Sequence, residues 1–87
     1  MKVELSDQAK RNLKGLDQQI ARRLLKFLID RVSKLEDPRS IGEALKGSRF
    51  GELWKYRVGD YRLISKIEDA VCLILILRIG NRKEVYH

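Results

Sequence analysis

Four cationic side chains and one tyrosine in the last third of the chain have types and spacings suited to chemistry on a phosphate group. Lys55, Arg57 and Arg62 lie in one short segment, and Arg82 and Tyr86 lie four residues apart further along. Guanidinium groups match the geometry of phosphate oxygens, and a phenol can transfer a proton. These five residues are therefore the candidate catalytic set.

The two arginines of the first segment are separated by a predicted hairpin turn. Gly59 and Asp60 stand between strand-forming residues, which is typical of a two-residue loop. Such a loop places Arg57 directly opposite Arg62, and like charges facing each other destabilise a sheet. A fold keeps such a pair most readily when an anion lies between the two side chains. The spacing therefore favours a phosphate-binding site.

The chemistry open to this set is narrow. The chain has one histidine, His87, so neither a histidine-pair ribonuclease nor a serine triad with a well-placed base is expected. Cleavage of RNA by its own 2′-hydroxyl needs in-line geometry, charge stabilisation and proton transfer at two oxygens. Arginines supply the charge stabilisation. Unperturbed tyrosine and lysine titrate near pH ~10, and surrounding cations lower both pKa values. Such a site requires a scaffold that positions the RNA.

Composition indicates one small folded domain over residues 1–87 with an anionic partner. Apolar residues make up 44% of the chain, and 19 Lys and Arg against 12 Asp and Glu give a net charge of +7. A sequence pI near 9.9 is typical of nucleic-acid binders, and an acidic protein partner fits equally well. The charge excess is spread over both halves of the chain. The fold must therefore assemble any basic patch.

The single cysteine and the absence of a leader pattern favour a reducing cytoplasm. Cys72 lies inside the apolar run 70–77, so we expect a buried, inert thiol. This run is much shorter than the roughly 20 apolar residues of a membrane span. One cysteine and one histidine cannot build a zinc site within one chain. We therefore expect no membrane segment, no metal and no cofactor.

The pattern of elements predicts an α+β fold. Residues 2–5 alternate as a strand, Ser6 caps a helix that ends at Gly15, and Asp17 caps a longer helix through about Leu35. The charged side of that second helix, which includes Arg31, is interpreted as solvated; the alternative is contact with a partner. Residues 38–51 are expected to form a loop with one helical turn. Strands follow at about 52–58, 61–67 and 71–78. This β-α-α-β-β-β order places two helices on one face of a largely antiparallel, four-stranded twisted sheet.

Strand alternation sorts the residues of the hairpin onto two faces. Large apolar side chains, from Trp54 to Leu63, are expected to meet the helices. The opposite face carries Lys55, Arg57, Arg62, Ile64 and Lys66. A solvated sheet face is the ordinary alternative for such a pattern. The tail leaves the last strand at Gly80, so Arg82 and Tyr86 can fold back beside the same face.

At these residues the chain resembles the RelE branch of the RelE/ParE toxin superfamily over nearly its whole length. The resemblance implies a toxin that cleaves mRNA in the ribosomal A site by 2′-hydroxyl attack, leaving a 2′,3′-cyclic phosphate and a 5′-hydroxyl. It also implies an acidic cognate antitoxin that wraps the toxin, and no small-molecule ligand. It is carried by Leu45-Lys-Gly47, the hairpin from Trp54 to Leu63, and Gly80-Asn-Arg-Lys-Glu-Val-Tyr86.

The resemblance assigns a role to each candidate. Tyr86 matches the family's general base and stacking residue, Arg82 the acid or the stabiliser of the leaving group, and Arg62 the stabiliser of the transition state. Lys55 and Arg57 lie on the strand that supplies further basic residues, with Lys55 as a proton or charge partner. Further candidates for RNA binding are Lys46, Arg49 and Lys83.

Departures from the family pattern leave alternatives open. Asn81 stands where many relatives have histidine, Leu53 replaces a lysine, and the spacing from Arg82 to Tyr86 is shorter than in the best-studied branch. A non-enzymatic toxin that inhibits DNA gyrase, as the ParE branch does, shares the fold and does not need the Arg82 and Tyr86 pair. A basic RNA-binding module is the third alternative.

Overall fold

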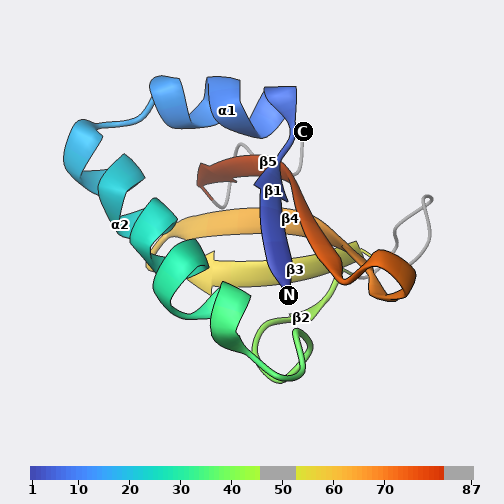
Figure 1. The fold of residues 1–87 in the computed structure, drawn as a ribbon. Helices are drawn as coiled ribbons and strands as arrows, with labels where there is room; N and C mark the ends of the chain where they lie inside the picture. Colours follow the sequence, from blue (N-terminus) through green and yellow to red (C-terminus); the bar gives the residue numbers. More distant parts are fainter. Residues whose placement is uncertain (46–52, 82–87) are drawn as a thin grey trace.

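The computed structural model describes residues 1–45 and 53–81. Along the chain, a strand and two helices precede the remaining strands (Figure 1). The elements are β1 (Lys2–Leu5), α1 (Asp7–Lys14), α2 (Gln18–Asp30), the 3₁₀ turn η1 (Val32–Lys34), β2 (Glu43–Ala44), β3 (Leu53–Val58), β4 (Tyr61–Glu68), the 3₁₀ turn η2 (Asp69–Val71) and β5 (Leu73–Asn81). Within the described ranges, neither helix is long and apolar enough to cross a membrane.

The strands form one sheet in the order β1-β5-β4-β3-β2, with β1 parallel to β5 and the other neighbours antiparallel. The two-helix, largely antiparallel architecture is confirmed, but the sheet has five strands and not the predicted four. The additional strand, β2, lies in the segment that was predicted to be a loop with a helical turn. Because β2 has only two residues, it carries no readable alternation.

Both helices begin where the sequence predicts. The Ser6 hydroxyl accepts a hydrogen bond from the Ala9 amide, and the Asp17 carboxylate accepts one from the Gln19 amide. These side chains satisfy amides that have no partner within the helix. The first helix ends at Gly15 as predicted, and the second ends earlier, with Arg31 as its C-cap before η1.

The core lies between the helices and one face of the sheet (Figure 1). Tyr56 and Leu63 are fully buried in it together with Leu24 and Leu28 from α2. The ring of Phe27 meets the ring of Tyr56 edge-on, with centroids 6.4 Å apart. The predicted assignment of the large hairpin side chains to the helix-facing side is therefore confirmed.

The start of the last strand differs from the prediction, and Cys72 differs with it. Residues 69–71 form η2, and β5 begins only at Leu73. Cys72 lies between them with a φ of 52°, in the left-handed region, and its side chain is exposed. The prediction of a buried thiol was wrong because the apolar run continues into the turn that precedes the strand.

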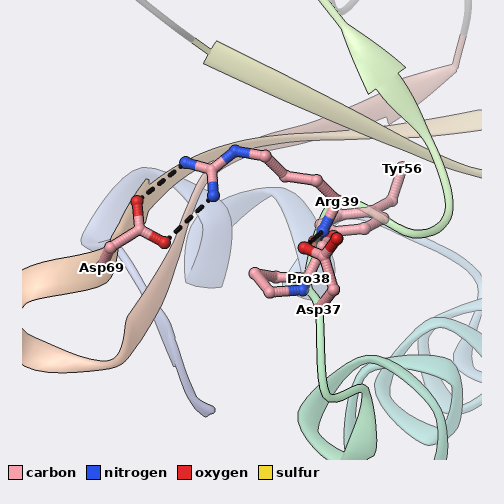
Figure 2. A network of polar contacts seen from close by, with 5 residues as sticks. All are labelled: Asp37, Pro38, Arg39, Tyr56 and Asp69. Carbon is pink, nitrogen blue, oxygen red and sulfur yellow. Dashed lines mark hydrogen bonds and ion pairs between the residues drawn. The ribbon is translucent and has the colours of Figure 1, made fainter.

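A polar network connects the segment after α2 to the sheet (Figure 2). The buried Tyr56 hydroxyl donates to the Pro38 carbonyl at 2.5 Å, and burial raises the pKa of Tyr56 to about 12. Arg39 reaches η2, where its guanidinium donates to both carboxylate oxygens of Asp69 at 3.0 Å. This hydrogen bond lowers the pKa of Asp69. The network fixes the segment that leads into β2.

Removing the Tyr56 hydroxyl should destabilise the fold without opening the core. We expect Tyr56→Phe to lower the free energy of unfolding by about 1–3 kcal/mol, because the buried Pro38 carbonyl loses its donor. Urea denaturation measures this change. Tyr61→Phe is the matched control, since the Tyr61 hydroxyl makes no hydrogen bond within the described residues, and it should change stability much less.

Tyr56 should also make the free energy of unfolding depend on pH in the alkaline range. Its folded pKa is about 12 and its model-peptide value is 10.0, so the folded state holds the phenol proton more tightly. The resulting stabilisation is complete below pH 10.0 and is lost as the pH rises toward 12. The difference in stability between wild type and Tyr56→Phe should therefore shrink across that interval. A constant difference would contradict the burial of this hydroxyl.

Candidate nucleic-acid interface

The hairpin between β3 and β4 has the predicted register. Val58 pairs with Tyr61, Arg57 pairs with Arg62, and Gly59 turns the chain with a φ of 58°. A positive φ is readily accessible to glycine, which explains why glycine suits this turn. The two arginines therefore lie directly opposite each other on the face of the sheet that points away from the helices.

Arg62 is held more rigidly than an ordinary surface arginine. The residue is only 8% exposed. One of its guanidinium nitrogens donates to the carbonyls of Gly59 and Tyr61, each at 3.2 Å. On the other side it faces Gly80 of β5, which adds no side chain beside it. Among the described residues, no carboxylate forms an ion pair with Arg62. Its positive charge is therefore held in place without a counter-charge among the described residues.

Lys55 lies on the same face and is joined to Glu43. Glu43 in β2 pairs with Lys55 in β3, and their side chains form an ion pair with 3.0 Å between Nζ and Oε1. The Lys55 side chain is largely buried at 19% exposure, whereas that of Glu43 is 67% exposed. The short strand β2 therefore holds a carboxylate against one of the candidate catalytic cations.

The structure adds Arg78 to this face, which sequence reasoning missed. Arg78 of β5 pairs with Ile64 of β4, which in turn pairs with Lys55 of β3. The register between β4 and β5 shifts by one residue between Ile64 and Ser65, so simple alternation along β5 assigns Arg78 to the wrong face. The available signal was its charge, since an arginine in an apolar strand rarely faces a core.

We call this surface the basic face. Its cations come from three neighbouring strands, and a phosphate resting on it meets several positive side chains at once. Arrangements of this kind stabilise the charge that develops on a phosphorane, and they bind a nucleic-acid backbone without metal. The basic face consists of Lys55, Arg57, Arg62, Lys66 and Arg78.

A groove opens beside the basic face along the outer edge of β3. It has a volume of about 610 Å³ and collects side chains from the end of α2, the segment around β2, and β3. We call it the edge groove. Its lining consists of Phe27, Arg31, Ile41, Gly42, Glu43, Lys55, Tyr56 and Arg57.

Gly42 allows the chain to approach β3 closely enough for β2 to pair. Its φ is +82°, and a Cβ at this position would lie 2.5 Å from the Lys55 carbonyl and 2.7 Å from the Trp54 indole nitrogen. The Trp54 indole donates to the Ile41 carbonyl at 2.8 Å, so this nitrogen cannot move away freely. Any larger residue at Gly42 forces the segment away from β3.

We therefore expect Gly42→Ala to destabilise the protein by roughly 1–3 kcal/mol from backbone strain, with the steric overlap adding to this. The Glu43 and Lys55 ion pair should be lost as well. Thermal denaturation and the Lys55 side-chain NMR signals report the two effects. Gly15→Ala is the control, because its φ is negative and an added Cβ meets nothing closer than 3.6 Å. Equal stability of the two variants would contradict the close approach at Gly42.

Several predicted site residues lie outside the part of the chain that the structure describes. Lys55, Arg57 and Arg62 are described and lie on one face, as predicted. The other five lie outside the described residues, and the predicted roles of all eight stay predictions. These five residues are Lys46, Arg49, Arg82, Lys83 and Tyr86.

Comparison with known proteins places the chain among bacterial and archaeal toxins. Residues 3–86 match the model of a family described as the ParE toxin of the type II toxin–antitoxin system parDE. The chain is 29% identical over 84 residues to the toxin RelG of Mycobacterium tuberculosis, covering 97% of this chain and 93% of the relative.

Solved structures share the fold. The toxin–antitoxin complex RelBE2 from Mycobacterium tuberculosis contains a chain that matches with a TM-score of 0.82 and 27% identity, covering 93% of this chain and 96% of that one. A chain of the archaeal RelE-RelB complex from Pyrococcus horikoshii matches with a TM-score of 0.73 and 28% identity, covering 97% of both chains. The similarity extends over the whole fold that carries the basic face.

Proposed function

Because the chain belongs to the ParE toxin family of type II toxin–antitoxin systems, within the RelE/ParE superfamily, we propose that it is a ribosome-dependent endoribonuclease that cleaves mRNA in the A site. The observation that carries the proposal is the cross-strand pair of Arg57 and Arg62 on the basic face. A bound phosphate removes the repulsion between these guanidinium groups, and RNA supplies a phosphate at every nucleotide.

The proposed reaction uses the RNA's own nucleophile. The 2′-oxygen loses its proton to Tyr86 and attacks the adjacent phosphorus, and the bond from phosphorus to the 5′-oxygen breaks. The leaving oxygen takes a proton from Arg82, the candidate acid, and becomes a 5′-hydroxyl, while the other fragment ends in a 2′,3′-cyclic phosphate. Solvent then returns a proton to Arg82 and removes the one held by Tyr86. Arg62 stabilises the phosphorane, Arg82 stabilises the leaving group, and Lys55 assists as a charge partner. The ribosome supplies the in-line geometry.

The proposed partner that silences this activity is an acidic cognate antitoxin, in the cytoplasm. Two of the similar structures are complexes of a toxin with its antitoxin. An acidic segment that covers the basic face neutralises its charge and blocks access of RNA. The net charge of +7 supports an acidic partner of this kind.

The antitoxin proposal predicts mutual exclusion. A purified complex of this chain with its antitoxin should cleave no mRNA, and it should release activity when the antitoxin is degraded. Proteolysis of the antitoxin in a translation reaction measures this. A complex that cleaves at the full rate of the free toxin would show that neutralisation, if it occurs, leaves the basic face open.

The name of the matching family model also favours a second candidate, a non-enzymatic toxin that inhibits DNA gyrase. The two candidates are separated by comparing the chain's effects on translating ribosomes and on supercoiling by purified gyrase. We expect shortened mRNA when ribosomes are present, intact mRNA when they are absent, and unchanged gyrase activity. Inhibited supercoiling together with intact mRNA would favour the second candidate.

A further inference from the structure

The edge groove lies along a part of β3 that pairs with no other described strand on its outer side. Pairing between β2 and β3 includes only Trp54 and Lys55, so Arg57 lies beyond it. The opposite wall of the groove is formed by Phe27 and Arg31 at the end of α2. The volume of about 610 Å³ falls within the roughly 300–1,000 Å³ of small-ligand sites.

The groove carries an excess of positive charge. Arg31, Lys55 and Arg57 line it, and among the described lining residues Glu43 is the one carboxylate. Glu43 is engaged with Lys55 at 3.0 Å, and no carboxylate among the described residues forms an ion pair with Arg31 or Arg57. Two guanidinium groups are therefore available to the oxygens of an anion.

One wall of the groove is apolar. Phe27 and Ile41 are half-buried, so each keeps part of its surface open. The ring of Phe27 is held by its edge-on contact with Tyr56, which is fully buried and anchored through its hydroxyl. A fixed aromatic ring beside two guanidinium groups suits a ligand with both a flat ring and a phosphate.

Lys55 and Arg57 belong both to the basic face and to the edge groove, so one strand of RNA can occupy both surfaces. We propose that the edge groove binds one nucleotide flanking the cleaved one, with Arg31 and Arg57 contacting its phosphate and Phe27 contacting its base. This inference rests on the proposed function of the basic face as an RNA site. A nucleotide uses both the cations and the aromatic wall, because it carries a phosphate and a flat ring in one unit.

The test uses the full chain and a short single-stranded RNA with 2′-O-methyl groups, which cannot be cut. In an NMR titration we expect the signals of Phe27, Arg31 and Ile41 to shift. Arg31→Ala should weaken binding roughly tenfold, the lower end for a hydrogen bond to a charged group. The slope of log affinity against log salt should also fall by about 0.7, as for one lost phosphate contact on a single strand.

The matched control is Arg22→Ala, an exposed cation on the same helix that does not line the groove. Its affinity should stay within about twofold of wild type, as for an ordinary surface substitution. Equal losses for both variants would indicate only general charge attraction and would overturn the proposal. Unchanged RNA binding by Arg31→Ala would overturn the proposal too. So would an Arg31→Ala variant that loses affinity only for the antitoxin, or a wild-type protein that does not bind the RNA.

Binding and cleavage are read separately in this design. If wild-type protein binds the RNA through Arg31 but never cleaves mRNA on ribosomes, the proposed enzymatic function fails and the groove assignment is supported. If it cleaves mRNA normally and Arg31→Ala binds like wild type, the groove assignment fails alone.

Discussion

Arg62→Ala should abolish growth inhibition and slow mRNA cleavage by about 10²–10³-fold, the loss typical when one preorganised contact to a developing charge is removed. Arg62 is buried and held by two carbonyls, so its guanidinium is already positioned before RNA arrives. Single-turnover cleavage on programmed ribosomes measures the effect. The double variant with Arg82→Ala should lose less activation free energy than the sum of the two single losses, because both residues stabilise the same transition state.

Controls separate this effect from loss of the fold. Circular dichroism should still show the folded protein, because the substitution also removes the like-charge opposition of Arg57 and Arg62, and the thermal midpoint measures what the lost hydrogen bonds to two carbonyls cost. Lys14→Ala removes an exposed positive charge on α1 and should leave cleavage unchanged. A fully toxic Arg62→Ala would contradict the assignment of the basic face as the reaction site.

Tyr86→Phe should reduce cleavage by about 10²–10⁴-fold, the usual contribution of general acid–base catalysis. The substitution keeps the aromatic ring and removes only the hydroxyl group, which accepts and donates the proton. Ribosome binding should be unchanged, so the loss should appear in the single-turnover rate and not in affinity.

Tyr86→Ala is the companion variant that removes the ring as well. A near-normal rate for Tyr86→Phe combined with a large loss for Tyr86→Ala would show that Tyr86 stacks on a base and transfers no proton. The base would then be Lys55 in its neutral form, which requires the side chain to lose a proton and leave its ion pair with Glu43 first. In that case Lys55→Ala should show the larger loss in rate.

Local chemistry made much of the fold predictable. Ser6 and Asp17 cap their helices through hydrogen bonds that depend only on residues two or three positions away. The Gly59 turn fixes the register of its own hairpin, so the opposition of Arg57 and Arg62 could be derived from spacing alone. These features need no information from distant parts of the chain.

The errors arise where distant segments decide the outcome. The two residues of β2 become a strand only because Gly42 lets them reach β3. The one-residue shift between Ile64 and Ser65 places Arg78 on the basic face, and apart from the charge of Arg78 nothing along β5 indicates this. Cys72 is exposed because the run 70–77 includes a turn, and hydrophobicity alone does not distinguish turn from strand.

The residues of the candidate site also differ in how far the sequence predicted them. Arg57 and Arg62 were predictable because one hairpin holds both residues. Arg31 was interpreted as part of a solvated helix surface, since nothing in the helical pattern reveals that it reaches a groove shared with β3. Its position depends on how α2 packs across the sheet, which is set by core contacts such as Phe27 against Tyr56.

The most direct test of the central claim is to map the new RNA ends formed when the purified chain is added to a reconstituted translation system. We predict breaks inside the codon held in the A site of each stalled ribosome, with a 5′-hydroxyl on one fragment and a 2′,3′-cyclic phosphate on the other. The breaks should be absent without ribosomes and absent with Arg62→Ala. Intact mRNA at toxin concentrations that arrest growth, or ends that carry a 5′-phosphate, would contradict cleavage by the RNA's own 2′-hydroxyl on the basic face.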